Sequence, residues 1–178
     1  MKVKIFHFGL GSLGISLVLG SVLFLSVRAA APASQTWQPA EVGNPFPVFS
    51  LPDLDGEIHS VSSLSGQPAI INFWASWCTP CEQEMPLLQD YAGQYPQVTF
   101  VGINSGENPA LVAPFLDRYG ITFPVWLDLD AKVTDGLRII ALPVTYFLDS
   151  QGIIRGKHLG QLTPALMERY LQQLEVEP

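Results

Sequence analysis

The spacing of apolar residues along this chain changes repeatedly, and the changes predict strands that alternate with helices. Continuous apolar runs, typical of strands buried on both faces, cover residues 69–73, 98–103, 125–128 and 144–148. Apolar residues at helical spacing predict helices over 80–91, 109–119, 131–139 and 164–174, the second ended by Gly120 and the last capped by Thr163. A turn-forming run over 149–152 predicts that a final strand, 153–158, pairs with the preceding one as a hairpin.

An additional hairpin is expected before the first buried run. Residues 45–49 and 51–58 give two short extended pieces around the turn Asp55-Gly56, and 61–66 form a connector. We expect this hairpin to cover the sheet. With the strand and helix alternation that follows it, the pattern predicts an α/β sandwich in which helices flank a central mixed sheet. A chain of 178 residues, 48% of them hydrophobic, is long enough for one domain with its own core.

The first 28 residues are expected to direct the chain out of the cytoplasm. Lys2 and Lys4 precede an uncharged stretch over 10–27. At a rise of about 1.5 Å per residue, such a stretch can cross an apolar layer of about 30 Å, which favours an uncleaved membrane anchor. The small residues 29–31 offer a cleavage site, so a signal peptide remains the alternative. In both cases the domain faces outward, in the periplasm, a lumen or the cell exterior.

Residues 29–41 are expected to form a tether with Trp37 as an interfacial residue, and 42–178 to form the folded domain. The net charge of the chain is −7, and beyond Arg28 the remaining six basic and 16 acidic residues give −10. This acidic balance argues against nucleic acid or an anionic membrane surface as a partner.

The only two cysteines, Cys78 and Cys81, lie between a predicted buried strand and a predicted helix. A strand that leads into Cys-x-x-Cys at a helix start is typical of a redox-active dithiol, because the positive end of the helix dipole favours a thiolate. Cys78 is expected to lie exposed and to attack, and Cys81, one turn inward, to resolve the mixed disulfide. The disulfide itself would be the redox group, with no further cofactor.

Other uses of the cysteine pair are weaker. A structural disulfide across so short a loop would remove little entropy from the unfolded chain. A zinc site would need a second Cys or His pair, whereas His7, His59 and His158 lie far apart in the sequence. His158 is expected to be a surface residue at a strand end. A copper carrier that uses Cys78, Cys81 and His158 as ligands remains an alternative.

Several stretches around and beyond the cysteines match one known family. They are Asn72-Phe73-Trp74-Ala75-Ser76-Trp77-Cys78-Thr79-Pro80-Cys81, Glu84-Met85-Pro86, Phe123-Pro124-Val125, Leu142-Pro143-Val144-Thr145-Tyr146-Phe147-Leu148-Asp149 and Gly152-Ile153-Ile154. In these stretches the chain resembles the TlpA/ResA-like thiol:disulfide oxidoreductases, which are related to CcmG/DsbE, are membrane-anchored and belong to the cytochrome c maturation group. The resemblance covers residues 42–174. It implies a thioredoxin-like fold and a dithiol that reduces disulfides of exported proteins, with apocytochrome c as the leading client and a membrane thiol protein as electron donor. A monomer is expected.

The resemblance also implies a role for Glu84, which follows Cys81 by three residues. As a third catalytic residue it would move a proton to or from a thiol, and its charge would raise the pKa of nearby thiols. The alternative is an ordinary acid near a helix start, favoured by the dipole. Glu82 is expected to be a solvated surface charge. Asn72 stands where thioredoxin itself carries a buried acid, and an Asn there can simply satisfy a backbone group.

The expected substrate contacts come from two loops. Trp77 would form a partly exposed wall, with Trp74 packed beneath the loop, while Thr79 and Pro80 tune the geometry of the dithiol. Pro143 matches the cis-proline of the family, and Leu142 would offer backbone hydrogen bonds to an extended substrate. The substrate-binding residues are therefore expected to be Trp77, Thr79, Pro80, Leu142 and Pro143.

A resemblance to peroxiredoxins over 54–74 does not extend to their catalytic pattern, Pro-x-x-x-Thr/Ser-x-x-Cys. Before Cys78 the two key positions hold Ile71 and Ala75, and before Cys81 they hold Trp74 and Cys78. Peroxidase activity is therefore not expected. A disulfide-forming oxidase or isomerase on the same fold and a general reductant of many envelope proteins remain alternatives to a reductant with one client.

Overall fold

The computed structural model describes residue 37 and residues 39–176. The expected anchor or signal sequence over 1–28 lies outside this part of the chain, as does the expected tether up to residue 36. None of the helices in the described part has the length and apolar character of a membrane span.

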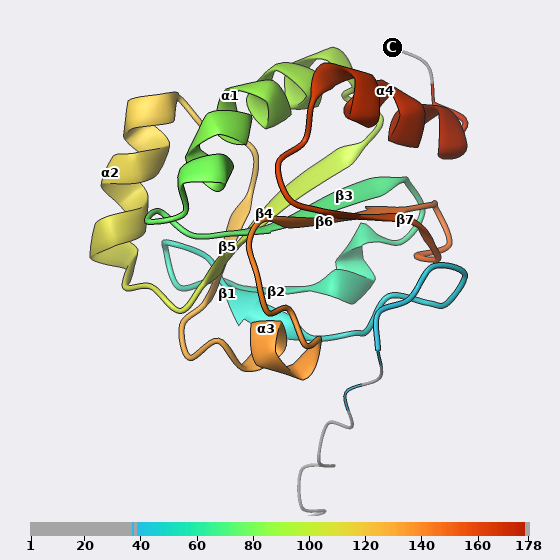
Figure 1. Cartoon of the computed structure of the whole chain (residues 1–178). Helices are drawn as coiled ribbons and strands as arrows, with labels where there is room; N and C mark the ends of the chain where they lie inside the picture. Colours follow the sequence, from blue (N-terminus) through green and yellow to red (C-terminus); the bar gives the residue numbers. More distant parts are fainter. Residues whose placement is uncertain (1–36, 38, 177–178) are drawn as a thin grey trace, which may run out of the picture. The chain divides into compact units, whose positions relative to one another are not determined.

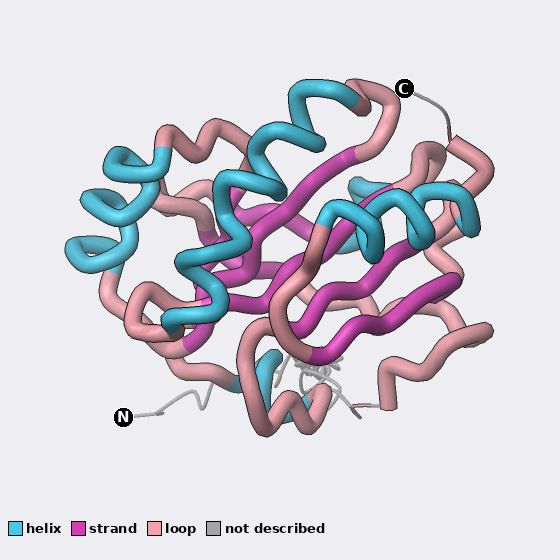
Figure 2. The backbone as a smooth tube through the Cα atoms, turned by 45° about the horizontal axis from the view of Figure 1, so that its top comes forward, coloured by secondary structure: helices cyan, strands magenta, loops and turns pink. Residues whose placement is uncertain are grey.

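A five-stranded mixed sheet forms the centre of the domain (Figures 1 and 2). In spatial order its strands are β5 (Val125–Asp128), β4 (Thr99–Ser105), β3 (Ala69–Trp74), β6 (Val144–Leu148) and β7 (Ile154–Leu159). Strands β3, β4 and β5 run parallel to one another, whereas β6 is antiparallel to β3 and β7 is antiparallel to β6. The predicted mixed sheet is confirmed, and the strand bounds differ from the predicted ones by at most two residues.

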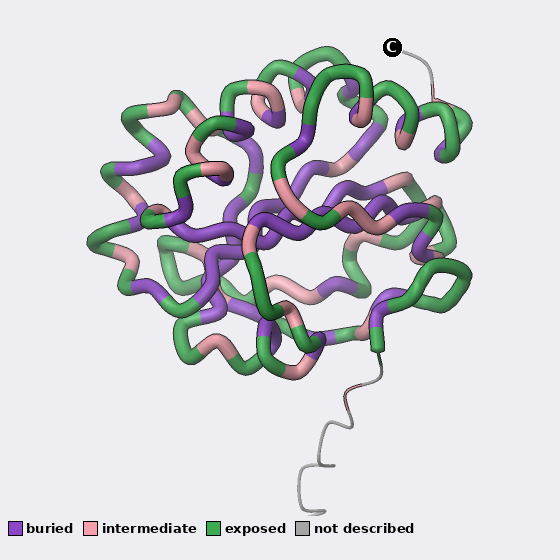
Figure 3. The backbone as a smooth tube through the Cα atoms, viewed as in Figure 1, coloured by how far each residue is buried: buried purple, intermediate pink, exposed green. Residues whose placement is uncertain are grey.

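Helices and a small hairpin cover the two faces of this sheet (Figure 1). One face carries the helices α1 (Thr79–Gln94), α2 (Pro109–Tyr119) and α4 (Pro164–Gln173). The other face carries the strands β1 (Ser50–Pro52) and β2 (Ile58–Ser60), the 3-10 turn η1 (Val61–Leu64) and the helix α3 (Lys132–Gly136). The sheet between these layers is largely buried (Figure 3). The predicted N-terminal hairpin is thus present, but β1 at 50–52 lies after the predicted piece 45–49, and only the end of the predicted piece 51–58 belongs to β2. The turn between the two strands begins at Asp53, which shortens both of them.

Alternation along β3 sends its side chains to two separate core clusters. Ile70 and Trp74 belong to the cluster beneath α1, α2 and α4, whereas Ile71 and Phe73 belong to the cluster beneath the hairpin and α3. Because both faces are covered, the strand is apolar in the sequence at every position except Asn72. Asn72 lies between Ile70 and Trp74 in this alternation, so its side chain faces α1.

Two helices differ from their predicted bounds by more than one residue. The helix α1 begins at Thr79, with Cys78 as its N-cap, and continues to Gln94. The helix α3 is shorter than the predicted 131–139, because Ala131 and Arg138 both have φ of 55°, a left-handed conformation that cannot continue a helix. Gly120 adopts the left-handed conformation at the end of α2, as predicted.

The end of the expected tether contacts the folded domain. The ring of Trp37 lies 6.1 Å from that of Phe49, and Ala40 is buried in the cluster beneath the hairpin. The Lys157 ammonium also donates a hydrogen bond of 3.3 Å to the Ala40 carbonyl. Trp37 is therefore a packing residue of the domain rather than a free interfacial one, and the contacts of the domain extend upstream of residue 42.

Gly102, in the middle of β4, provides a test of this packing. A Cβ atom there would lie 2.9 Å from Nε1 of Trp74 and 3.3 Å from side-chain atoms of Phe123 and Val125. We expect Gly102→Ala to lower the free energy of unfolding by about 1–3 kcal/mol, the usual cost of overpacking. Gly93→Ala in α1, where a Cβ meets no neighbour within 4 Å, should instead raise it by up to about 1 kcal/mol. Urea titration measures both, and a Gly102→Ala variant as stable as Gly93→Ala would contradict this packing.

Candidate active site

Cys78 and Cys81 form a disulfide at the start of α1, with a Cα–Cα distance of 5.2 Å. Cys81 is fully buried, and Cys78 is only 5% exposed. The prediction that Cys78 lies exposed is therefore wrong for this oxidised form. Its sulfur turns toward the helix, where it is bonded to Cys81 and accepts the Cys81 backbone N–H at 3.3 Å. The predicted order is kept, since Cys78 is the more exposed of the two residues.

The backbone around the dithiol explains why the helix begins there. Cys78 has an extended conformation, with φ of −87° and ψ of 100°, and its N–H donates to the Ala75 carbonyl at 3.2 Å. Pro80 lies in the first turn, where it has no N–H to lose and its fixed φ suits a helix. The sulfur of Cys78 thus occupies the N-cap position, at the positive end of a 16-residue helix.

Glu84 is buried beneath this turn and is hydrogen-bonded on both carboxyl oxygens. Its Oε1 accepts the side-chain amide of Asn72 at 2.8 Å, and its Oε2 accepts the backbone N–H of Leu162 at 2.7 Å. Only 1% of the residue is exposed, so it is not an ordinary surface acid near a helix start. Burial raises the pKa of Glu84 to about 7, while the hydrogen bonds from Leu162 and Asn72 act in the opposite direction.

The register of the sheet brings the partners of Glu84 together. Asn72 on β3 lies opposite Thr145 on β6, and its amide donates to the Thr145 hydroxyl at 2.9 Å. The alternative role of Asn72, in which it satisfies a backbone group, is therefore wrong, because its amide binds two side chains. Glu84 follows Cys81 by three residues on one helix, a spacing that puts their Cβ atoms about 5–6 Å apart. Glu84, whose pKa burial raises to about 7, thus lies within one helical turn of Cys81.

The loop before β6 supplies the second group of predicted site residues. The peptide bond between Leu142 and Pro143 is cis, as predicted. The Pro143 carbonyl accepts the Gly160 N–H at 2.9 Å, which ties this loop to the end of β7. Leu142 packs against the core cluster that contains both cysteines. The cis bond is therefore in the same part of the core as the dithiol.

Aromatic and polar contacts surround the dithiol loop, which is the segment 75–78 between β3 and α1. Trp74 is fully buried, as predicted, and its ring centroid lies 4.8 Å from that of Phe115 on α2. The next ring on α2, Tyr119, donates its hydroxyl to Glu82. This hydrogen bond raises the pKa of Tyr119. The prediction that Glu82 is a solvated surface charge is therefore wrong, because it joins α1 to α2.

Glu107 is a buried acid that the sequence analysis did not identify. Its carboxylate accepts the Ser76 backbone N–H at 2.6 Å, the Ser76 hydroxyl, and the Asn104 amide at 2.7 Å. The one sequence signal that points to it is its place just after β4, since the carboxyl ends of parallel strands commonly carry functional loops.

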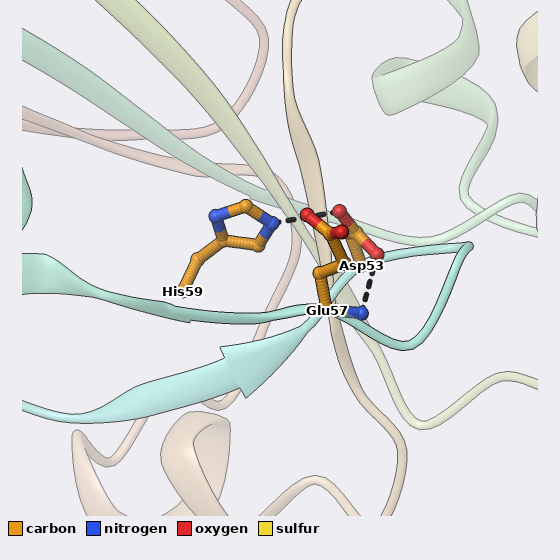
Figure 4. A group of neighbouring side chains, drawn as sticks. All are labelled: Asp53, Glu57 and His59. Atoms are coloured by element: carbon orange, nitrogen blue, oxygen red, sulfur yellow. Dashed lines mark hydrogen bonds and ion pairs between the residues drawn. The ribbon is translucent and has the colours of Figure 1, made fainter.

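Asp53, Glu57 and His59 form a cluster in the N-terminal hairpin (Figure 4). One potential ligand atom from each lies within 4.8 Å of the others, which the sequence did not predict. Asp53 accepts the His59 imidazole at 2.7 Å and the backbone N–H groups of Asp55 and Glu57 at 2.9 and 3.0 Å. The hydrogen bond from His59 lowers the pKa of Asp53. These contacts close the hairpin turn, on the face of the sheet opposite α1.

The geometry does not favour the copper-carrier alternative. Among the described residues, the hairpin cluster is the only group in which three His, Cys or acidic side chains bring ligand atoms together. Cys78 and Cys81 are joined to each other, and Nε2 of His158 lies 3.3 Å from the Gln161 carbonyl. His158 is half-buried on β7 beside Tyr170, with 6.0 Å between ring centroids. In this oxidised form the two cysteines and His158 are not arranged as a metal site.

The site and fold have counterparts in known proteins. The sequence model of the AhpC/TSA family matches residues 42–157. Thiol-disulfide oxidoreductase ResA of Geobacillus kaustophilus is 34% identical over 136 residues, which are 75% of this chain and 78% of that protein. Thioredoxin-like protein YneN of Bacillus subtilis is 37% identical over 145 residues, 77% of this chain and 85% of YneN. A solved thiol:disulfide interchange protein of the thioredoxin family from Chlorobium tepidum matches with a TM-score of 0.66 and 27% identity, over 75% of this chain and 97% of the other.

The buried carboxyl of Glu84 should make the stability of the oxidised protein depend on pH. Because its pKa is raised from 4.5 to about 7, the folded chain binds this proton more tightly than the unfolded chain does. Its contribution to stability is complete below pH 4.5 and is lost as the pH rises to 7. We expect the free energy of unfolding to fall across this window by up to ~3 kcal/mol more in the wild type than in Glu84→Gln.

Denaturant titrations at a series of pH values measure this difference. Glu175→Gln, which changes an exposed carboxylate, should keep the wild-type dependence and serves as the control. If Glu84→Gln retained the full wild-type dependence, the assignment of the titration to Glu84 would be wrong.

Proposed function

The chain belongs to the AhpC/TSA family and is a thiol:disulfide oxidoreductase, and we propose that its dithiol donates electrons to disulfides of exported proteins outside the cytoplasm. The observation that carries this direction is the buried carboxyl of Glu84, one helical turn from Cys81. A dithiol becomes a strong oxidant when its reduced form, the thiolate, is stabilised. The negative charge of ionised Glu84 disfavours a nearby thiolate, which favours electron donation.

In the proposed reaction, the Cys78 thiolate attacks one sulfur of the client disulfide. The client S–S bond breaks, a mixed disulfide forms, and the departing client thiolate takes a proton from water. Cys81 then gives its proton to the Glu84 carboxylate and attacks the sulfur of Cys78. The second client sulfur leaves as a thiolate and takes up that proton. Two electrons have passed to the client, and the Cys78–Cys81 disulfide remains.

The geometry supports a division of roles between the cysteines. Cys81 is fully buried one helical turn from the Glu84 carboxyl, whereas Cys78 is the N-cap and, at 5% exposure, the more accessible of the two. An incoming thiolate from the electron donor would therefore attack Cys78 in the oxidised protein. The same sulfur then attacks the client after reduction, when the N-terminus of α1 stabilises its thiolate.

Exposed apolar side chains in the loop before α1 and in the loop before β6 support binding of an extended client segment. Trp77, directly before Cys78, is 70% exposed, and Ile140, two residues before Leu142, is 97% exposed. Large exposed apolar residues are typical of interaction sites. In this proposal the backbone of Leu142 hydrogen-bonds the client. The proposed substrate contacts are Trp77, Thr79, Pro80, Leu142 and Pro143.

The identity of the partners is proposed from the resemblance to the TlpA/ResA-like group. It favours apocytochrome c as the client and a membrane thiol protein as the donor of electrons. We propose that residues 1–28 tether the domain to the membrane and that the domain acts as a monomer. The acidic balance beyond Arg28 supports protein partners rather than nucleic acid.

The reduction potential of the Cys78–Cys81 pair tests the direction of electron flow. Equilibration against defined thiol buffers at neutral pH should give a value near that of thioredoxin, about −270 mV. A value near about −120 mV would identify an oxidant and would reject the proposed direction. Glu84→Gln, which removes the charge near the dithiol, should shift the potential toward more oxidising values.

Trapping variants test the roles of the cysteines and reveal the clients. Cys81→Ser should accumulate client proteins in mixed disulfides through Cys78, because the resolving thiol is absent, whereas Cys78→Ser should capture none. Non-reducing electrophoresis of cells that express each variant measures the adducts. One dominant adduct would support a dedicated client and many adducts a general reductant, while capture by Cys78→Ser alone would reverse the assignment.

A further inference from the structure

We infer that Glu107 is a positioning residue that fixes the loop carrying Cys78. The inference rests on the thiol–disulfide exchange activity and is independent of the direction of electron flow. It arises from a contact between the loop that follows β4 and the loop that precedes α1, 31 residues apart in the sequence.

The carboxylate of Glu107 binds both hydrogen-bond donors of a single residue. The backbone N–H of Ser76 donates to Oε2 at 2.6 Å, and the hydroxyl of Ser76 donates to Oε1. Hydrogen bonds to an ionised acceptor are shorter and stronger than neutral ones. A two-point contact of this kind restrains both the position and the orientation of Ser76.

Burial makes the contact unusual for a surface loop. Glu107 is only 6% exposed, and within the described residues it takes part in none of the ion pairs. Its remaining polar contact is the Asn104 amide, which donates to Oε2 at 2.7 Å. A buried carboxylate is costly unless hydrogen bonds replace its hydration. Here three donors do so, and two of them belong to the dithiol loop.

The segment that carries Glu107 is itself fixed on both sides. The N–H of Gly106 donates to the Asp128 carbonyl at 2.8 Å, and the Ser105 hydroxyl donates to that of Thr134 at 2.9 Å. On the other side, the Asn108 side chain caps α2 by accepting the Ala110 N–H. Contacts with the end of β5 and with the start of α2 thus fix the backbone on both sides of Glu107. The Glu107 carboxylate therefore has a defined position relative to Ser76.

The dithiol loop has few other anchors between the sheet and the helix. Ser76 is followed by Trp77, whose side chain is 70% exposed, and then by Cys78. Within this stretch of the described chain, the backbone N–H of Cys78 donates to the Ala75 carbonyl at 3.2 Å. Loss of the hydrogen bonds between Ser76 and Glu107 would let this turn move, and with it the Cys78 sulfur at the N-cap. Exchange rates are sensitive to such displacements, because the attacking and attacked sulfurs must be aligned.

Two substitutions of Glu107 separate the effect of its hydrogen bonds from the effect of its charge. In Glu107→Gln, an amide oxygen at the Oε2 position can still accept from Ser76 N–H and Asn104. The amide nitrogen at the Oε1 position can donate to the Ser76 hydroxyl, which is able to accept. Glutamine therefore retains all three contacts without the charge. Glu107→Ala retains none.

The test measures the second-order rate of reduced full-length protein with oxidised glutathione, over a range of pH. We expect Glu107→Ala to slow the reaction about tenfold or more, and Glu107→Gln to stay within about threefold of the wild type. The remote variant Glu175→Ala is the control for general effects and should react at the wild-type rate. Unfolding curves recorded in parallel show that each variant is folded under the assay conditions.

Either of two results would overturn the inference. If Glu107→Ala reacted at the wild-type rate, the hydrogen bonds between Glu107 and Ser76 would not position the dithiol. If Glu107→Gln were as slow as Glu107→Ala, the charge of Glu107 would act instead of its hydrogen bonds. If Glu107→Ala does not fold, Ser76→Ala decides, because it removes only the hydroxyl contact. It should slow the reaction about threefold, and a wild-type rate would reject the role. Every variant and the wild type react with the same probe, oxidised glutathione. The comparison of their rates therefore remains valid even if the proposed direction of electron flow in the cell is wrong.

Discussion

The start of α1 is the point on which the rest of the site depends. Cys78 provides the N-cap, and its sulfur accepts the backbone N–H of Cys81. This one choice of helix start determines which residues face inward. Cys81 falls on the buried side of the first turn, and Glu84 falls one turn further on the same side. A helix that began one residue earlier or later would rotate both Cys81 and Glu84 away from the buried face of α1.

A layer of polar side chains links this helix to the sheet. Asn72 lies on the α1 face of β3, where Ile70 and Trp74 are otherwise apolar, and it connects Glu84 to Thr145. The low dielectric of a core makes unpaired polar groups costly. The Asn72 amide nitrogen and both Glu84 oxygens are hydrogen-bonded, whereas Oδ1 of Asn72 has no hydrogen-bond partner among the described residues. Burial of the carboxyl raises the pKa of Glu84 to about 7, although the hydrogen bonds from Leu162 and Asn72 act in the opposite direction. In the proposed mechanism, this buried carboxyl exchanges a proton with a thiol.

The sequence predicted what depends on local pattern. Strands buried on both faces appear as apolar runs, so their bounds were correct within two residues, and Cys-x-x-Cys after such a run located the dithiol. The end of α3 was missed because Ala131 and Arg138 adopt a left-handed conformation that their residue types do not signal. The sequence did not predict the burial of Cys78 or the hydrogen bonds between Glu107 and Ser76. Both depend on contacts between residues that are distant in the sequence.

The bond between Glu84 and Leu162 joins residues 78 positions apart, and this separation sets the order in which the protein can mature. A chain that is synthesised from its N-terminus presents both cysteines long before β6 and the segment ahead of α4 exist. Until those last residues arrive, the carboxyl group lacks its backbone partner and its enclosed surroundings. We therefore expect the nascent cysteines to react as an ordinary solvent-exposed pair until the segment from β6 onward, about the last fifth of the chain, closes over α1.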